Sequence, residues 1–291
     1  DNDKTYNLMY GNNDGAAPMS LLSSVTNPSV NPLLVTDPTV LDDASVTSRY
    51  YQLITIDGGV PTTGAVVWAL QKQDRRSNAW HMLAAPVHYG DTADNRLSGT
   101  FGQQLGDGLI ARHNEVLAPN VWSWDDAAGA WTNFWFNTNR TWYGGPSEAS
   151  TYYANPERGL WIKTTPTDSG SSNTVFMGQT HTNTSGINMT SNTWILFSWP
   201  FAAMQQESVG TTGNQGWQFS AQGGQQGTDW ADADRMFAEY GGAWYTLYLG
   251  SGGRWYILNT TNTAPIALQH GKAYYYYSQG TTFVWRATPA N

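Results

Sequence analysis

The chain has 291 residues, of which 14 are Lys or Arg and 22 are Asp or Glu, so its formal net charge is −8. Only 12% of the residues are charged, about half the share of roughly 25% that is usual in globular proteins. A chain this poor in Lys and Arg lacks the positive surface that a phosphate backbone requires, which excludes nucleic acid as a partner. The lack of Cys excludes disulfides and thiolate metal sites. The longest apolar run, near Ala65–Leu70, is too short to span a membrane.

The N-terminal residues 1–43 are rich in Asn, Pro, Ser and Thr, and we expect an extended arm that does not fold back on itself. Residues 44–77 follow as a pair of strands that leads into the first module, with one strand over Tyr50–Ile56 and the other over Val66–Leu70. The chain begins at Asp1 rather than at Met, which is typical of a mature chain after removal of a signal peptide. We therefore expect an extracellular or cell-surface protein.

The rest of the chain contains an internal repeat. Trp80–Pro86 and Trp194–Pro200 share the pattern Trp-x-x-x-x-x-Pro at an offset of 114 residues (194 − 80), and Arg158–Ile162 matches Lys272–Tyr276 at the same offset. Further matches are Trp131 with Trp244, Trp142 with Trp255, and Val175–Met177 with Phe283–Trp285. A nearly constant offset predicts two tandem modules, residues 78–182 and 190–291.

Short alternating runs separated by Gly, Asn, Asp and Pro predict an all-β chain in which each module is a small sandwich or barrel, with at most one or two short helices. One helix is expected over Asp229–Tyr240, because its Asp residues would lie in the first turn, where the helix dipole favours negative charge. Further strands are expected at Ala79–Ala84, Trp131–Phe136, Gly159–Thr164, Asn173–Met177, Thr193–Ser198, Ala243–Leu249, Arg254–Leu258, Ala273–Tyr277 and Thr281–Arg286.

The paired Trp-x-x-x-x-x-Pro openings and the Gly-x-aromatic closing strands resemble tandem β modules of secreted surface proteins from planctomycete and verrucomicrobial bacteria. The segment Ser48–Leu53 also resembles a strand of such exported proteins. The resemblance covers residues 45–291 and implies an extracellular location and a modular β architecture. It implies no reaction, because that family is mostly without known activity. Glu157 stands where the second module has Gly271, so the closing turn is not uniform.

No catalytic constellation is recognisable. The five His residues form neither a His-x-His pair nor a His-Glu-x-x-His motif, and the chain has no Gly-x-Ser-x-Gly elbow and no Gly-rich phosphate loop. We therefore expect no enzyme. Asp229, Asp232 and Asp234 are an imperfect match to a Ca²⁺ loop, and the following Arg235 favours a capping role over metal binding, so no cofactor is expected.

The aromatic side chains are the remaining candidates for function. Because successive residues of a strand point to opposite faces, two rings of the run Tyr274–Tyr277 must face away from the core of their own module. Large rings also fill the cores of small β modules, which accounts for most of the Trp. The aromatic residues expected at a surface, whether a protein interface or a glycan site, are Trp135, Trp142, Tyr248, Trp255, Tyr274, Tyr275, Tyr276 and Tyr277.

Three hypotheses follow. The first is an extracellular structural subunit that binds copies of itself and builds a filament, tube or surface layer, since a head-to-tail contact that does not close gives an open array. A donated N-terminal strand would supply that contact, and its candidate residues are Leu21, Leu22, Val30, Leu33, Leu34, Val35 and Val40. The second is a carbohydrate-binding or adhesin protein whose exposed Trp and Tyr bind glycans. The third is a glycoside-active enzyme with two carboxylates across a sugar cleft.

Overall fold

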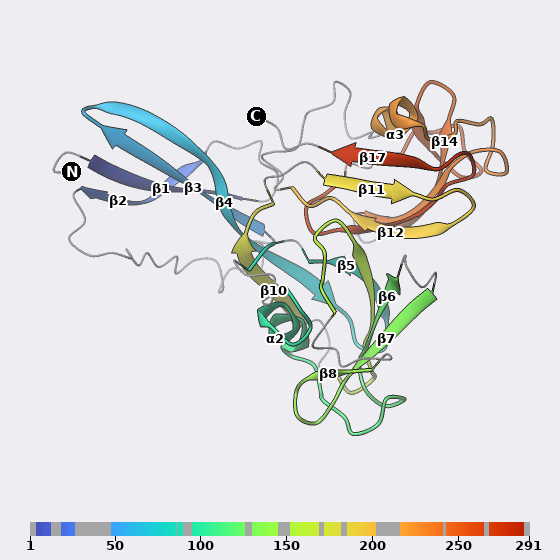
Figure 1. The fold of residues 1–291 in the computed structure, drawn as a ribbon, viewed down its shortest axis with the longest axis horizontal. Coiled ribbons are helices and arrows are strands. Elements are labelled where there is room, and N and C mark those ends of the chain that lie inside the picture. Colours follow the sequence, from blue (N-terminus) through green and yellow to red (C-terminus); the bar gives the residue numbers. More distant parts are fainter. Residues whose placement is uncertain are drawn as a thin grey trace.

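The computed structural model is all-β over the residues that it describes, which confirms the predicted fold class. These residues form three five-stranded sheets, one two-stranded sheet and two short helices. Figure 1 shows the N-terminal strands extending to one side of the other sheets. The described residues are 4–12, 19–26, 48–85, 87–89, 95–125, 130–144, 152–168, 172–181, 185–201, 216–240, 243–264 and 268–287.

The first sheet, with the strand order β10-β4-β3-β1-β2, contains all the N-terminal strands. Its members are β1 (Lys4–Asn12), β2 (Ser20–Thr26), β3 (Ser48–Asp57), β4 (Val60–Arg75) and β10 (Ser172–Gln179). The hairpin between β3 and β4 turns at Gly58 and Gly59, whose φ values of 56° and 83° favour glycine. Strand β4 has 16 residues and pairs with β10 only from Trp68 to Arg75. Its first half therefore extends the N-terminal sheet beyond β10.

The N-terminal segment differs from the extended arm that we expected. Strand β1 pairs with β2 in antiparallel register from Thr5↔Thr26 to Tyr10↔Ser20, and it also pairs with β3 along its whole length. The physical reason is that Tyr6, Leu8 and Tyr10 recur at every second position, which is the period of a strand, although Met9, at a register shift with β2, interrupts the alternation with polar residues. Residues 27–47 lie outside the described part of the chain.

Two further five-stranded sheets have the same topology. The first has the order β5-β9-β6-β7-β8 and the second the order β12-β16-β13-β14-β15. The strands of the first are β5 (Trp80–Ala84), β6 (Asn120–Asp125), β7 (Ala130–Phe136), β8 (Trp142–Tyr143) and β9 (Gly159–Lys163). Those of the second are β12 (Trp194–Ser198), β13 (Arg235–Tyr240), β14 (Ala243–Gly250), β15 (Arg254–Ile257) and β16 (Ala273–Tyr277). A helix follows the first strand of each sheet, α2 (Thr100–Gly106) or α3 (Gly216–Gln222).

The repeated sequence motifs lie on corresponding strands of these two sheets. Trp142 on β8 pairs with Phe136, and its counterpart Trp255 on β15 pairs with Leu249. The match of Val175–Met177 with Phe283–Trp285 is wrong by one residue. Phe176 stacks on Phe101 of α2, and Trp285 stacks on Phe219 of α3, with ring centroids 5.5 and 5.1 Å apart. Phe176 and Trp285 are therefore equivalent, since a shift of one residue would reverse the faces.

The helix expected over Asp229–Tyr240 does not form. Arg235–Tyr240 is strand β13, which lies between β14 and β16. Met236 and Ala238 are buried whereas Phe237 and Glu239 are half-buried, which is the two-residue period of a strand. The Asp residues before β13 stabilise turns instead of a helix terminus.

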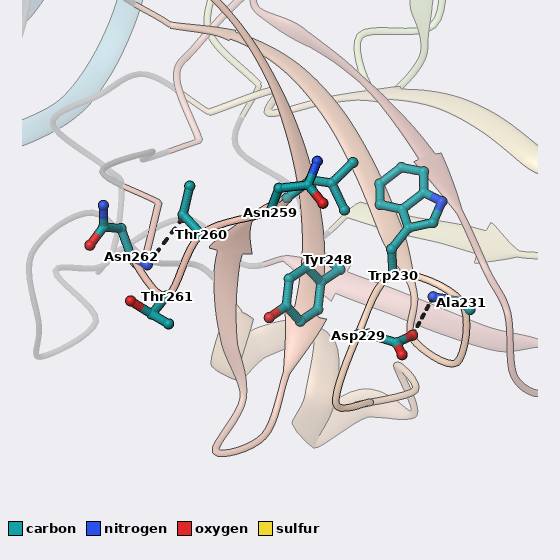
Figure 2. Close-up of a pocket in the computed structure, with 9 residues that line it drawn as sticks. Asp229, Trp230, Ala231, Tyr248, Asn259, Thr260, Thr261 and Asn262 are labelled. Atoms are coloured by element: carbon teal, nitrogen blue, oxygen red, sulfur yellow. Dashed lines mark hydrogen bonds between the residues drawn. The ribbon is translucent and has the colours of Figure 1, made fainter.

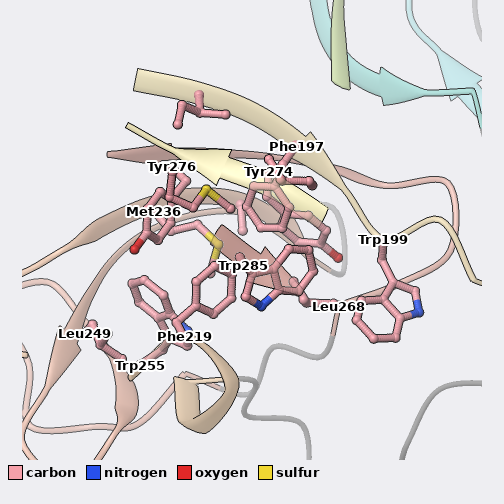
Figure 3. Packing of buried hydrophobic residues seen from close by; sticks show 14 of the residues in the cluster. Phe197, Trp199, Phe219, Met236, Leu249, Trp255, Leu268, Tyr274, Tyr276 and Trp285 are labelled. Carbon is pink, nitrogen blue, oxygen red and sulfur yellow. The ribbon is translucent and has the colours of Figure 1, made fainter. Parts of the chain in front are cut away.

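Each of the two sheets packs over a core of its own. In the second, the sheet of β11 (Ser185–Met189) and β17 (Phe283–Ala287) and the helix α3 cover the inner face. Trp285 of β17 contacts Phe197 of β12 and lies parallel to Phe219, with 3° between the ring planes (Figure 3). This arrangement resembles a sandwich with an aromatic interior.

Candidate functional site

The outer faces of the two five-stranded sheets pack against each other. Met82 on β5 forms a small buried cluster with Leu196 on β12 and Ala273 on β16. Gly159, the first residue of β9, permits this close approach, because a Cβ atom there would lie 2.6 Å from Leu196 Cγ and 2.7 Å from Ala273 Cβ. The two copies of the sequence repeat thus also pack against each other, with the outer face of one sheet on the outer face of the other.

Aromatic rings surround this contact in matching pairs. The ring centroid of Trp161 on β9 lies 6.1 Å from that of Tyr275 on β16, the equivalent residue of the other sheet. The ring centroids of Trp131 and Tyr275 are 6.4 Å apart. In the same way, the ring of Trp244, the counterpart of Trp131, lies 6.2 Å from that of Trp161. The side of Tyr275 that faces away from its own core is therefore partly covered by rings of the other sheet, and the residue is half-buried. This contact removes one of the reasons for expecting a partner at the tyrosine run.

Half of the predicted surface aromatics are core residues, so their placement at a surface is wrong. Trp142, Trp255, Tyr274 and Tyr276 are each at most 4% exposed. The alternation of the strands turns them inward, and Trp142 Nε1 donates to the Gly102 carbonyl. The predicted residues that are half-buried are Trp135, Tyr248, Tyr275 and Tyr277.

An aromatic band runs along the outer faces of both sheets. We define it by its successive ring contacts, which have centroid distances between 4.6 and 6.4 Å: Trp122, Trp80, Trp161, Tyr275, Trp194, Phe237 and Trp230. Trp80 remains 47% exposed. Arg235 extends the band, because its guanidinium lies 5.0 Å from the centroids of both Trp230 and Tyr277.

An open depression lies at the Trp230 end of the band (Figure 2). Its volume is about 790 Å³. It lies between the turn before β13 and the loop after β15, with Tyr248 of β14 between them. The lining residues are Asp229, Trp230, Ala231, Tyr248, Leu258, Asn259, Thr260, Thr261 and Asn262. The sequence pointed to Tyr248 and Asp229 separately, and the hairpin of β14 and β15 brings the later loop beside them.

The three Asp residues weighed as Ca²⁺ ligands accept backbone hydrogen bonds. Asp229 Oδ1 accepts from Ala231 N at 2.7 Å, and Asp232 Oδ1 accepts from Asp229 N at 3.1 Å. The latter bond is the main cause that lowers the pKa of Asp232. Within the described ranges, no three His, Cys, Asp or Glu side chains are placed to hold a metal ion.

Asp234 is fully buried and joins three segments. Oδ2 accepts from Gln225 N at 2.9 Å and from the Tyr276 hydroxyl, and Oδ1 accepts from Gln279 N at 2.7 Å. Burial raises the pKa of Asp234, and these hydrogen bonds oppose the rise. Its role is structural, since it connects the loop after α3 to the ends of β13 and β16.

Two His residues that the sequence did not connect lie in contact. His88 Nε2 and His181 Nδ1 are 2.6 Å apart, so one nitrogen carries the proton and donates it to the other. Glu157 Oε1 lies 3.9 Å from His181 Nε2. Burial lowers the pKa of His88. The residues are 93 positions apart in the chain, and the antiparallel bridge between His88 and Gln179, at the end of β10, brings them together.

The N-terminal sheet presents two strand edges. No described residue pairs with β2 on the side away from β1, or with Val60–Val67 of β4 on the side away from β3. Neither segment contains a charged residue, and Leu21 on β2 is 54% exposed. Of the residues predicted for strand donation, Leu21 and Leu22 thus lie on an edge strand of their own sheet. Val30, Leu33, Leu34, Val35 and Val40 lie outside the described residues.

No family model, curated protein or solved structure matches this chain. Among the described helices, none has the length and apolar character needed to cross a membrane.

Proposed function

We propose that the chain is an extracellular structural subunit that binds copies of itself through the two edges of its N-terminal sheet. The observation that carries the proposal is the pair of uncharged edges, β2 and Val60–Val67 of β4, at opposite sides of one sheet. An edge strand offers a row of backbone donors and acceptors to another strand, and proteins that avoid such pairing protect their edges with charges, Pro or bulges. Here Pro61 removes one donor near the start of β4. The register with the neighbouring strand also shifts at Leu22 on β2 and between Thr63 and Trp68 on β4.

The two edges are complementary in length and direction. At about 3.3 Å per residue each edge is about 25 Å long. Strands β2, β1, β3 and β4 alternate in direction, because each neighbouring pair is antiparallel. Strands β2 and β4 therefore run in opposite directions, so β2 of one copy can pair with β4 of the next in an antiparallel ladder. Each edge of one copy thus fits the opposite edge of another copy.

This contact does not close on itself. A contact between different surfaces of identical subunits forms a ring or an open array. Four strands at a spacing of about 4.8 Å would place successive copies about 19 Å apart along the sheet. Their twist of about 20–25° per strand would add a rotation of roughly 80–100° per copy. Such a combination of rise and rotation supports a helical filament.

Charge substitution at the edges tests the proposal. Leu21→Lys and Thr63→Lys place a cation on each edge, and Val116→Lys is the matched control, since Val116 is 86% exposed on a turn away from the sheet. Sedimentation and negative-stain microscopy are expected to show assemblies for the wild type and for Val116→Lys, and monomers for Leu21→Lys plus Thr63→Lys. Leu21→Lys combined with Thr63→Glu is expected to restore assembly. A wild type that stays monomeric up to its solubility limit would refute the proposal.

A further inference from the structure

We propose that the depression beside Trp230 and Tyr248 is a binding site for a neutral oligosaccharide. It combines two aromatic rings with hydroxyl, amide and carboxylate groups around an open hollow. Pyranose sugars have the complementary surface, with apolar C–H faces that stack on rings and a rim of hydroxyls that donate and accept. Ligand sites commonly combine an apolar surface with a few convergent polar groups in this way.

Both rings are held in place before any ligand binds. The Arg235 guanidinium lies 5.0 Å from the Trp230 ring centroid, and Phe237 contacts the same ring edge-on at 5.8 Å. Arg235 Nε also donates to the Trp230 carbonyl at 2.7 Å. Tyr248 stacks on Tyr256 with centroids 5.7 Å apart. Rings fixed in this way lose little conformational freedom on binding, which favours affinity.

The polar groups of the rim are also fixed. Thr260 Oγ1 donates to the Ile257 carbonyl at 3.0 Å and accepts from Asn262 N at 3.1 Å. Asn259 has a φ of 61°, a left-handed conformation that few residues other than glycine adopt. Asp229 uses Oδ1 to hold the turn at Ala231, and a carboxylate has further acceptor positions for sugar hydroxyls.

The charges around the depression disfavour an anionic ligand. Asp229 lines it and Asp232 lies three residues further along the same turn. The neighbouring cation, Arg235, is engaged by the carbonyls of Trp230 and Ala231 and by Gln279 Oε1 at 3.1 Å. An acidic sugar would therefore be repelled, whereas a neutral chain would not.

The first module supplies an internal comparison. Asn114 Oδ1 accepts from Val116 N at 2.8 Å, which is the same turn that Asp229 and Ala231 form. Glu115 then stands at the position of Trp230. Trp135 and Tyr143 correspond to Tyr248 and Tyr256 by their positions in the strand ladders. Asp229→Asn is thus a substitution that the fold already tolerates, and Trp135→Ala is a matched control for Tyr248→Ala.

Isothermal titration with cellohexaose, xylohexaose, mannohexaose, chitohexaose and laminarihexaose, and with oligogalacturonate as the anionic probe, tests the site. We expect at least one neutral probe to bind more tightly than about 1 mM and oligogalacturonate not to bind. Trp230→Ala and Tyr248→Ala are expected to weaken binding about tenfold or more, as the loss of a central ring does in other interfaces. Asp229→Asn should weaken binding less, and Trp135→Ala should leave it unchanged.

Two results would overturn the inference. The first is a wild type that binds none of the neutral probes. The second is binding that Asp229→Asn, Trp230→Ala and Tyr248→Ala all leave unchanged, because the ligand would then lie elsewhere. Asp229→Asn keeps the turn, so its effect cannot come from misfolding. The inference does not depend on self-assembly, and the monomeric variant Leu21→Lys plus Thr63→Lys should bind the same probe equally well.

Discussion

Asp234 is expected to be the most important single polar residue of the second module. It is fully buried, and three donors from three segments point to its carboxylate: Gln225 N, Gln279 N and the Tyr276 hydroxyl. Asp234→Ala leaves all three without an acceptor. Each buried group that loses its partner costs about 1–3 kcal/mol. The variant no longer buries a carboxylate, which offsets part of this loss. We therefore expect a decrease of about 3 kcal/mol in the free energy of unfolding.

Asp234→Asn separates the hydrogen bonds from the charge. The amide keeps one oxygen acceptor and its size, so the loss should be about half that of Asp234→Ala. Urea unfolding followed by near-ultraviolet circular dichroism reports on the packed Trp and Tyr rings and gives both values. A free energy of unfolding for Asp234→Ala within about 0.5 kcal/mol of the wild type, the range of an ordinary surface substitution, would refute the reasoning.

The pH dependence of the stability difference between the wild type and Asp234→Asn shows whether burial or hydrogen bonding dominates at Asp234. Burial raises the pKa of Asp234 in the folded state above the ordinary value of 3.8. The folded state therefore holds the proton more tightly than the unfolded state. The stability of the wild type relative to Asp234→Asn should be highest below pH 3.8 and should fall as the pH rises through the folded pKa. A relative stability that rises with pH over this range would show that the hydrogen bonds outweigh burial.

Three further outcomes are expected. Gly159→Ala should lower the free energy of unfolding by about 1–3 kcal/mol, because its Cβ would overlap Leu196 and Ala273 where the two sheets meet. Gly186→Ala on β11, whose Cβ would lie an ordinary 3.6 Å from Val284, is the control, and equal thermal unfolding of the two variants would contradict this packing. Trp285→Ala should cost about 3–5 kcal/mol, since its ring is fully buried against Phe219, and chemical unfolding that shows a loss below 1 kcal/mol would be inconsistent with this core. The depressed pKa of His88 should give stability that is present above pH 6.5 and lost as the pH falls through the folded pKa. His88→Gln should flatten that part of the stability profile, and an unchanged slope would assign it to another group.

The sequence predicted the strands whose alternation is strong, such as Ala273–Tyr277, and it found the repeat that corresponds to two sheets of equal topology. It missed β13 because the preceding Asp residues imitate the first turn of a helix. It missed α2 and α3 because each is only seven residues long and contains glycine, which has low helix propensity. In each case, tertiary packing outweighs the local signal.

The candidate sites were harder to predict than the strands, because they depend on how distant segments meet. The identity of Tyr275 did not reveal that Trp131 and Trp161 from the other sheet would cover it. The depression at Trp230 requires the loop after β15 to lie beside the turn before β13, and that placement follows from the strand register. The pattern of residue types along the chain does not specify how these strands pair. The sequence could therefore name aromatic candidates but not separate core from surface.

The most direct test of self-assembly through the N-terminal sheet is electron cryo-microscopy of wild-type assemblies. We predict a continuous antiparallel sheet in which β2 of one subunit pairs with Val60–Val67 of β4 of the next. The repeat along the sheet should be about 19 Å, or four strands. A reconstruction in which subunits meet through the five-stranded modules, while both edges of the N-terminal sheet face solvent, would contradict the account.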